Sequence, residues 1–130
     1  MNLTPDIVDK VAALLGRYPR GLEDVSVYDG KGGPVVIRVA SLVDDKPFPT
    51  LFWLVDPALS YRIDQLEASG LILQFQQRID ADSQLQLHMQ ADHEAHIALR
   101  DQYMSPEIRT RLRELRQPHV QTLMRRVGAE

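Results

Sequence analysis

The chain has 130 residues, which suits one domain of ordinary size, and its 44% hydrophobic and 25% charged residues are typical of globular proteins. It contains no cysteine, which excludes disulfides, a thiolate nucleophile and cysteine-ligated metal sites. The formal net charge of −3 argues against a dedicated nucleic-acid partner. There is no membrane-span-length apolar run and no signal-peptide pattern at the N-terminus, so we expect a single cytoplasmic domain over residues 1–130, with no membrane partner.

The N-terminal residues predict a helix. Thr4 can cap it, Pro5 suits the first helical position, and Asp6 lies near the positive end of the helix dipole. A stripe of apolar residues at helical spacing follows, and we expect the helix to stop near Gly16.

The next forty residues predict a small antiparallel sheet. Residues 25–28, 35–40 and 50–55 have the alternation or β-branched content of strands. Residues 29–34, rich in glycine, must be a loop, and residues 44–47 are a turn. Because the connections are short, we expect two or three antiparallel strands.

After Pro57 the apolar spacing becomes helical. Ser69 and Gly70 end the first helix, and residues 71–79 suit either a strand or a helix, of which we prefer a helix. Asp82 and Ser83 with Gln86 resemble a capping box that opens a long helix to about residue 104. A last helix begins at residues 105–107 and is interrupted at residue 118, so the sequence predicts an α+β fold with a helical C-terminal half.

The turn at Pro47, Phe48, Pro49 and Thr50 is stiff, because the two prolines fix the backbone on both sides of Phe48. It presents Phe48 beside Trp53, either as part of an aromatic pocket or partner-binding rim or as a rigid entry to a core strand. The usual burial of aromatic side chains favours the second interpretation.

His88, Asp92 and His96 lie at helical spacing, so one helix face could offer imidazole and carboxylate ligands to a divalent metal. A solvated polar face is the preferred interpretation, since helical spacing alone supplies no further ligand and no hydrogen bonds that orient the ligands.

The C-terminal segment is rich in arginine. Helical winding sets Arg109, Arg113 and Arg116 along one side, where an anion, a nucleic acid or an acidic partner surface could dock. The alternative, which we prefer, is an ordinary solvated face. Neither a nucleophile constellation nor a phosphate-binding glycine motif is present.

Several segments over residues 12–104 resemble the bacterial family catalogued as "domain of unknown function five hundred and one". They are residues 15–21, 34–36, 46–54 and 66–70, together with His93, Glu94 and Arg100, and the most specific is the block Lys-Pro-Phe-Pro-Thr-Leu-Phe-Trp-Leu at 46–54. The family brings no established activity. The ligand-binding candidates within these segments are Arg20, Lys46, Phe48, Thr50, Trp53, Glu67, His93 and Arg100.

The resemblance also implies a possible metal site. Members of the family often carry cysteine where this chain has Asp29, Lys31 and Asp56, and a Lys-Cys-Leu-His run near residues 117–120. One hypothesis is that this chain rebuilt a thiolate site with harder ligands, namely Asp29, Asp56, His93 and His119. The preferred alternative is that the cysteines were structural and drifted.

The expected function is therefore a ligand-binding or protein-interaction module without a predicted cofactor, whose partner is a second copy or another protein. One alternative is a metal-dependent enzyme that uses His93 with Asp29 and Asp56. The other is a nucleic-acid binder that uses the arginine-rich C-terminal helix. The sequence leaves open whether the protein is an enzyme.

Overall fold

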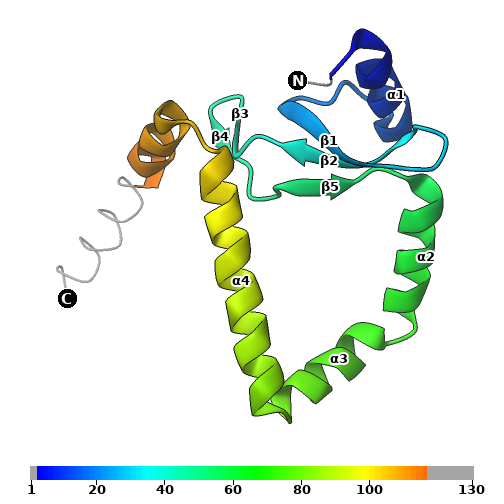
Figure 1. Ribbon diagram of the computed structural model, residues 1–130, viewed down its shortest axis with the longest axis vertical. Helices are drawn as coiled ribbons and strands as arrows, with labels where there is room; N and C mark the ends of the chain where they lie inside the picture. Colours follow the sequence, from blue (N-terminus) through cyan, green and yellow to red (C-terminus); the bar gives the residue numbers. More distant parts are fainter. Residues whose placement is uncertain (1–2, 117–130) are drawn as a thin grey trace, which may run out of the picture.

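The computed structural model describes residues 3–116, and it has the predicted α+β architecture (Figure 1). An N-terminal helix packs on a small antiparallel sheet, and the rest of the described chain is helical. Helices α2 (Pro57–Ala68), α3 (Leu71–Asp80) and α4 (Ser83–Tyr103) lead away from the sheet, turn back between α3 and α4 and return the chain to the sheet (Figure 1).

Helix α1 (Pro5–Leu15) has the predicted ends. The backbone N–H of Ile7 donates to the Thr4 hydroxyl at 3.2 Å, and Gly16 closes the helix in the left-handed conformation at φ 73°. Val11, fully buried, points its side chain into the core. The capping hydroxyl and the glycine satisfy polar groups that the helix itself cannot pair.

The main sheet consists of β1 (Leu22–Tyr28), β2 (Pro34–Val39) and β5 (Phe52–Leu54), in the order β1-β2-β5 with antiparallel neighbours. The predicted strand at 25–28 begins earlier, at Leu22, and the predicted strand at 50–55 is shorter. Because side chains alternate between the two faces of the sheet along β2, Val35, Ile37 and Val39 share the face toward α1, where they are buried. The core therefore lies between α1 and one face of this sheet.

A second, very small sheet was not predicted. Residues 44–47 were expected to be a turn, but β3 (Leu42–Val43) pairs with β4 (Lys46–Pro47), and only Asp44 and Asp45 form the turn. Both have positive φ, 51° and 60°, as mirror-image hairpin turns require. Aspartate tolerates this backbone conformation better than most residues, which is why the hairpin can form without glycine.

Helices α2 (Pro57–Ala68), α3 (Leu71–Asp80) and α4 (Ser83–Tyr103) confirm the preference for helix over 71–79. Asp82 caps α4 by accepting from the backbone N–H groups of Gln84 and Leu85. The capping box is only half right, because the Gln86 amide donates to the carbonyls of Ile79 and Asp80 instead of reaching back to the cap. Gln86 thereby ties the start of α4 to the end of α3.

The C-terminal end of α4 returns to the face of the sheet opposite α1. The Arg38 guanidinium lies 3.9 Å from the ring centroid of Tyr103, and the rings of Phe52 and His96 are 6.4 Å apart. Arg38 and Phe52 are cross-strand partners, so their side chains share that face.

A further helical segment covers residues 106–116, where the last helix was predicted to begin. The backbone N–H of Ile108 donates to the Ser105 hydroxyl at 3.2 Å, as a helix cap does. The predicted interruption at Pro118 lies outside the described residues. No helix within residues 3–116 combines the length and apolarity needed to cross a membrane.

Candidate functional site

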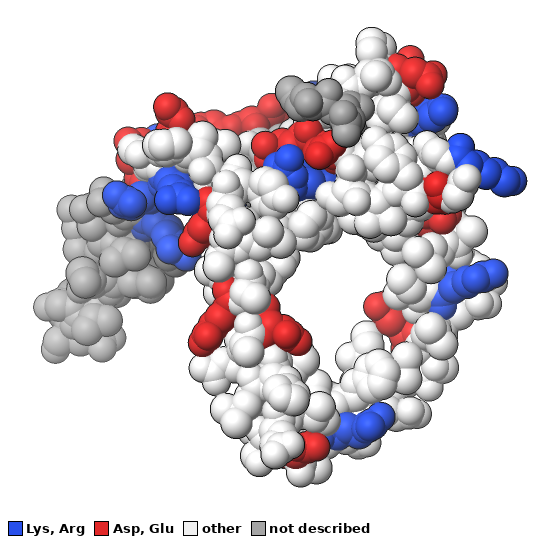
Figure 2. Space-filling view, viewed as in Figure 1, with Lys and Arg blue, Asp and Glu red and all other residues white. Residues whose placement is uncertain are grey.

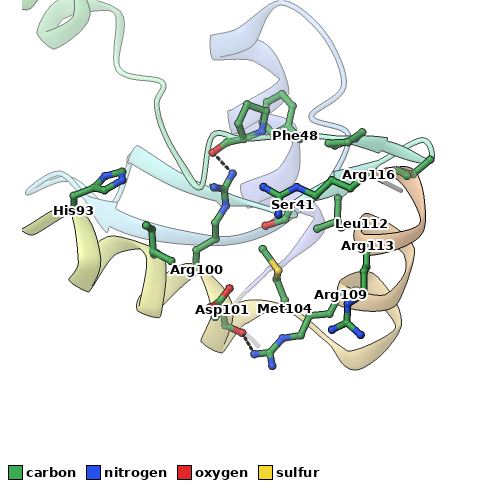
Figure 3. Close-up of a pocket in the computed structure, with 14 residues that line it drawn as sticks. Ser41, Phe48, His93, Arg100, Asp101, Met104, Arg109, Leu112, Arg113 and Arg116 are labelled. Carbon is green, nitrogen blue, oxygen red and sulfur yellow. Dashed lines mark hydrogen bonds between the residues drawn. The ribbon is translucent and has the colours of Figure 1, made fainter. Parts of the chain in front are cut away.

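A hollow of about 840 Å³ lies where the return of α4 meets the small hairpin (Figure 3). The proline-flanked turn after β4 forms one wall, the last turns of α4 form the floor, and the segment 106–116 forms the opposite wall. Its lining residues are Ser41, Pro47, Phe48, Pro49, His93, Ile97, Arg100, Asp101, Met104, Arg109, Leu112, Arg113, Leu115 and Arg116.

Phe48 connects this hollow to the core. Its backbone N–H donates to the Ser41 carbonyl at 2.8 Å, which continues the hairpin beyond β4. Its ring lies 6.2 Å from that of Trp53, the distance of an aromatic pair, and packs partly against the core cluster. The two interpretations of the turn are therefore compatible, since the Phe48 that packs against the core also lines the hollow.

The segment 106–116 is held in place by a two-pronged ion pair. Arg111 Nε and Nη2 donate to the two carboxylate oxygens of Asp45 at 2.7 and 2.6 Å, and Arg111 also pairs with Glu114 at 3.0 Å. The hydrogen bonds from Arg111 hold the pKa of Asp45 below its ordinary value, and the same contacts raise the pKa of Arg111. The unusual turn of the hairpin thus places a carboxylate where it anchors the far wall.

The hollow is basic. Among residues 3–116, four arginines line it, Arg100, Arg109, Arg113 and Arg116, against the single carboxylate of Asp101. Arg100 reaches across and donates to the Pro49 carbonyl, while Arg109 donates to the backbone carbonyl of Asp101. Among residues 3–116, Arg113 and Arg116 form no ion pair.

Arg100 extends from the floor of the hollow and Arg116 from the wall formed by residues 106–116, and their guanidinium groups point toward one another near Ser41 (Figure 3). The Arg100 Nε is buried and finds no hydrogen-bond partner within the described part of the chain. Two like charges directed at each other, one of them with an unsatisfied donor, are unfavourable unless an acceptor or an anion lies between them.

The structure brings together three of the eight ligand-binding candidates, Phe48, His93 and Arg100, in this hollow. Arg20 and Trp53 line a second hollow of about 430 Å³ on the other side of Phe48, where the Arg17 guanidinium lies 5.4 Å from the Trp53 ring. The remaining candidates, Lys46, Thr50 and Glu67, are exposed and lie outside both hollows.

Sequence reasoning missed the apolar lining and Ser41. Ile97 follows His93 by one helical turn, and Met104, the C-cap of α4, follows Arg100 by one turn, so helical spacing from those candidates would have indicated them. Nothing in the pattern around Ser41 marks it, because the hairpin that buries it was not predicted.

The predicted metal ligands are not brought together. Asp29 and Asp56 line a third hollow, beside α1, whereas His93 lines the first. Both carboxylates already accept hydrogen bonds from backbone N–H groups. Asp29 accepts from Lys31 and Gly33 at 2.8 Å, and Asp56 caps α2 by accepting from the backbone N–H of Ala58 at 3.0 Å. These backbone bonds lower the pKa of Asp29.

The fourth predicted ligand, His119, lies outside the described residues. His88, Asp92 and His96 are exposed on α4. Within residues 3–116, no three or more histidine, aspartate or glutamate side chains are grouped so that they could hold a metal ion.

A family model described as "Protein of unknown function (DUF501)" matches residues 25–129, which begin within β1 and include β2 to β5, helices α2, α3 and α4 and all the described residues that line the hollow. No curated protein and no solved structure matches the chain.

Proposed function

The chain belongs to this family of unknown function, and we propose that it is a ligand-binding protein whose basic hollow takes a small organic anion. The observation that carries the proposal is that the guanidinium groups of Arg100 and Arg116 point toward one another in a hollow that four described arginines line. An anionic oxygen between the two guanidinium groups would accept hydrogen bonds from them and offset the like charges.

The chemistry of the lining supports an anion with an apolar body. Guanidinium groups match the geometry of carboxylates and phosphates, and they bind them through paired hydrogen bonds. Phe48, Ile97, Met104 and Leu112 supply apolar surface beside the arginines. A predominantly apolar concave site with a few convergent polar groups is the usual form of a small-molecule site.

Titration calorimetry with phenyl phosphate, benzoate and inorganic phosphate tests the proposal. We expect phenyl phosphate and benzoate to bind more tightly than inorganic phosphate, because only they offer an apolar ring to Phe48 and its neighbours. Arg116→Gln should weaken their binding about tenfold or more, since a hydrogen bond to a charged group contributes roughly 1.5–3 kcal/mol.

Arg62→Gln is the matched control, because Arg62 is an exposed arginine on α2 and does not line the hollow. This variant should bind the anions as the wild type does. Absence of binding by all three anions, or equal weakening by the two substitutions, would contradict the proposal.

A further inference from the structure

The second hollow lies beyond the end of α1, between the loop that follows this helix and the small hairpin. Its floor is the core side of the sheet, because Ile37 and Val39 of β2 line it and are buried there. Trp53 of β5 is the cross-strand partner of Ile37 and lines the hollow as well. The volume of about 430 Å³ is within the range of small-molecule sites.

Two aromatic rings form one side of this hollow. Phe48 and Trp53 both line it, with their ring centroids 6.2 Å apart and their planes tilted by 38°. Both side chains also pack against the core cluster, so packing fixes their positions while each keeps some surface toward the hollow. Aromatic rings attract one another beyond the effect of the area that they bury. The hollow therefore favours a flat aromatic ligand over an aliphatic one of similar size.

The rim of the second hollow is basic. Arg17 and Arg20 line it, and no acidic side chain does so among the residues that the structure describes. The Arg17 guanidinium lies over the Trp53 ring, 5.4 Å from its centroid. This contact uses the flat face of the guanidinium, so the N–H groups at its edge can still donate to a carboxylate. Arg20 pairs with Asp44 at 2.8 Å, but both side chains are more than half exposed, and such an ion pair holds an arginine only weakly.

We propose that the second hollow binds a flat aromatic carboxylate, with its rings against Phe48 and Trp53 and its carboxylate at the Arg17 guanidinium. The buried apolar floor and the two arginines of the rim suit one charge on a large ring, whereas the first hollow has four arginines. Of the described residues, only Phe48 lines both hollows. The site is thus separate from the first hollow and does not rest on the function proposed for it.

The indole N–H resonance of Trp53 tests this inference, because Trp53 is the one tryptophan of the chain and lines only the second of these two hollows. In a ¹⁵N correlation spectrum of the full chain titrated with naphthoate, this resonance should shift and saturate. Naphthyl methanol, which lacks the charge, should bind about tenfold more weakly or worse. Cyclohexanecarboxylate, which lacks the flat rings, should also bind more weakly. A Trp53 resonance that naphthoate leaves unmoved would overturn the proposal.

Three variants assign the shift to the second hollow. Arg17→Gln should weaken naphthoate binding about tenfold or more, and because Arg17 is exposed, the spectrum of the free variant should keep its dispersion. Arg62→Gln, at an exposed arginine outside the hollow, should bind as the wild type does. Arg116→Gln, which alters only the first hollow, should also leave the Trp53 shift intact. A shift that Arg116→Gln abolishes and Arg17→Gln preserves would mean that Phe48 transmits binding from the first hollow, and it would overturn the proposal.

Discussion

At the scale of single residues, Asp45 has two structural roles. It occupies a left-handed turn position, and it also anchors the segment that carries three of the arginines of the hollow. Asparagine tolerates the same backbone conformation, so Asp45→Asn removes the charge without straining the turn.

We expect Asp45→Asn to lower the melting temperature slightly and to weaken anion binding, because the Arg111 anchor is lost. Asp44→Asn is the matched control: it removes the exposed pair with Arg20 at 2.8 Å but leaves Arg111 in place, so anion affinity should be unchanged. Equal anion affinity in the two variants would show that the anchor does not position the arginines.

The contribution of the Asp45 carboxylate to folding stability depends on pH in a defined direction. The pKa of Asp45 is lower in the folded protein than its ordinary 3.8, so the carboxylate stabilises the fold above that value. The stabilisation is lost as the pH falls through the folded pKa. The difference in melting temperature between wild type and Asp45→Asn should therefore be constant around neutral pH, and it should shrink below pH 3.8. A difference that grows on acidification would contradict this assignment.

At the scale of elements, the approach of the loop before β1 to the hairpin depends on Gly21. A Cβ there would lie 2.6 Å from Val43 Cγ2, and the residue has φ +78°. Gly16, at φ +73°, has open space around the same position. An alanine at either position would have to adopt the unfavourable left-handed backbone conformation, but only at Gly21 would its Cβ also clash with a neighbour.

Urea unfolding should separate these two costs. Gly16→Ala should lower the free energy of unfolding by about 1 kcal/mol, which is the cost of left-handed backbone alone. Gly21→Ala should lower it by roughly 2–4 kcal/mol, because overpacking adds to the same cost. Equal losses would mean that Val43 moves aside and that the hairpin is not held where the structure places it.

The elements show why local patterns predicted the fold better than the site. Helix caps and helix ends could be predicted from the sequence, because the residues that form them contact residues close to them in the chain. Examples are Thr4, Gly16 and Asp82. The turn at Asp44 and Asp45 was predicted, but the hairpin was missed because each of its strands, Leu42–Val43 and Lys46–Pro47, is only two residues long and too short to show a strand pattern. The meeting of Phe48 with Arg100 and Arg116 depends on the return of α4 across more than fifty residues, which no local pattern specifies.

At the scale of the whole molecule, the two ends of α4 have different surroundings. The sheet, α1 and the C-terminal end of α4 form a small packed body with the basic hollow at its edge (Figure 1). The other end of α4 lies away from the sheet, and its Leu87 and Met89 are exposed (Figure 2).

The Nε–Hε resonance of Arg100 tests the central claim most directly, because Nε belongs to the guanidinium that faces Arg116 across the hollow. In a ¹⁵N correlation spectrum of the full chain titrated with phenyl phosphate, this resonance should shift and saturate with the calorimetric Kd. The shift should be lost in Arg116→Gln and kept in Arg62→Gln. If phenyl phosphate binds by calorimetry while the Arg100 resonance stays unmoved, the anion binds elsewhere and the assignment of the hollow is wrong.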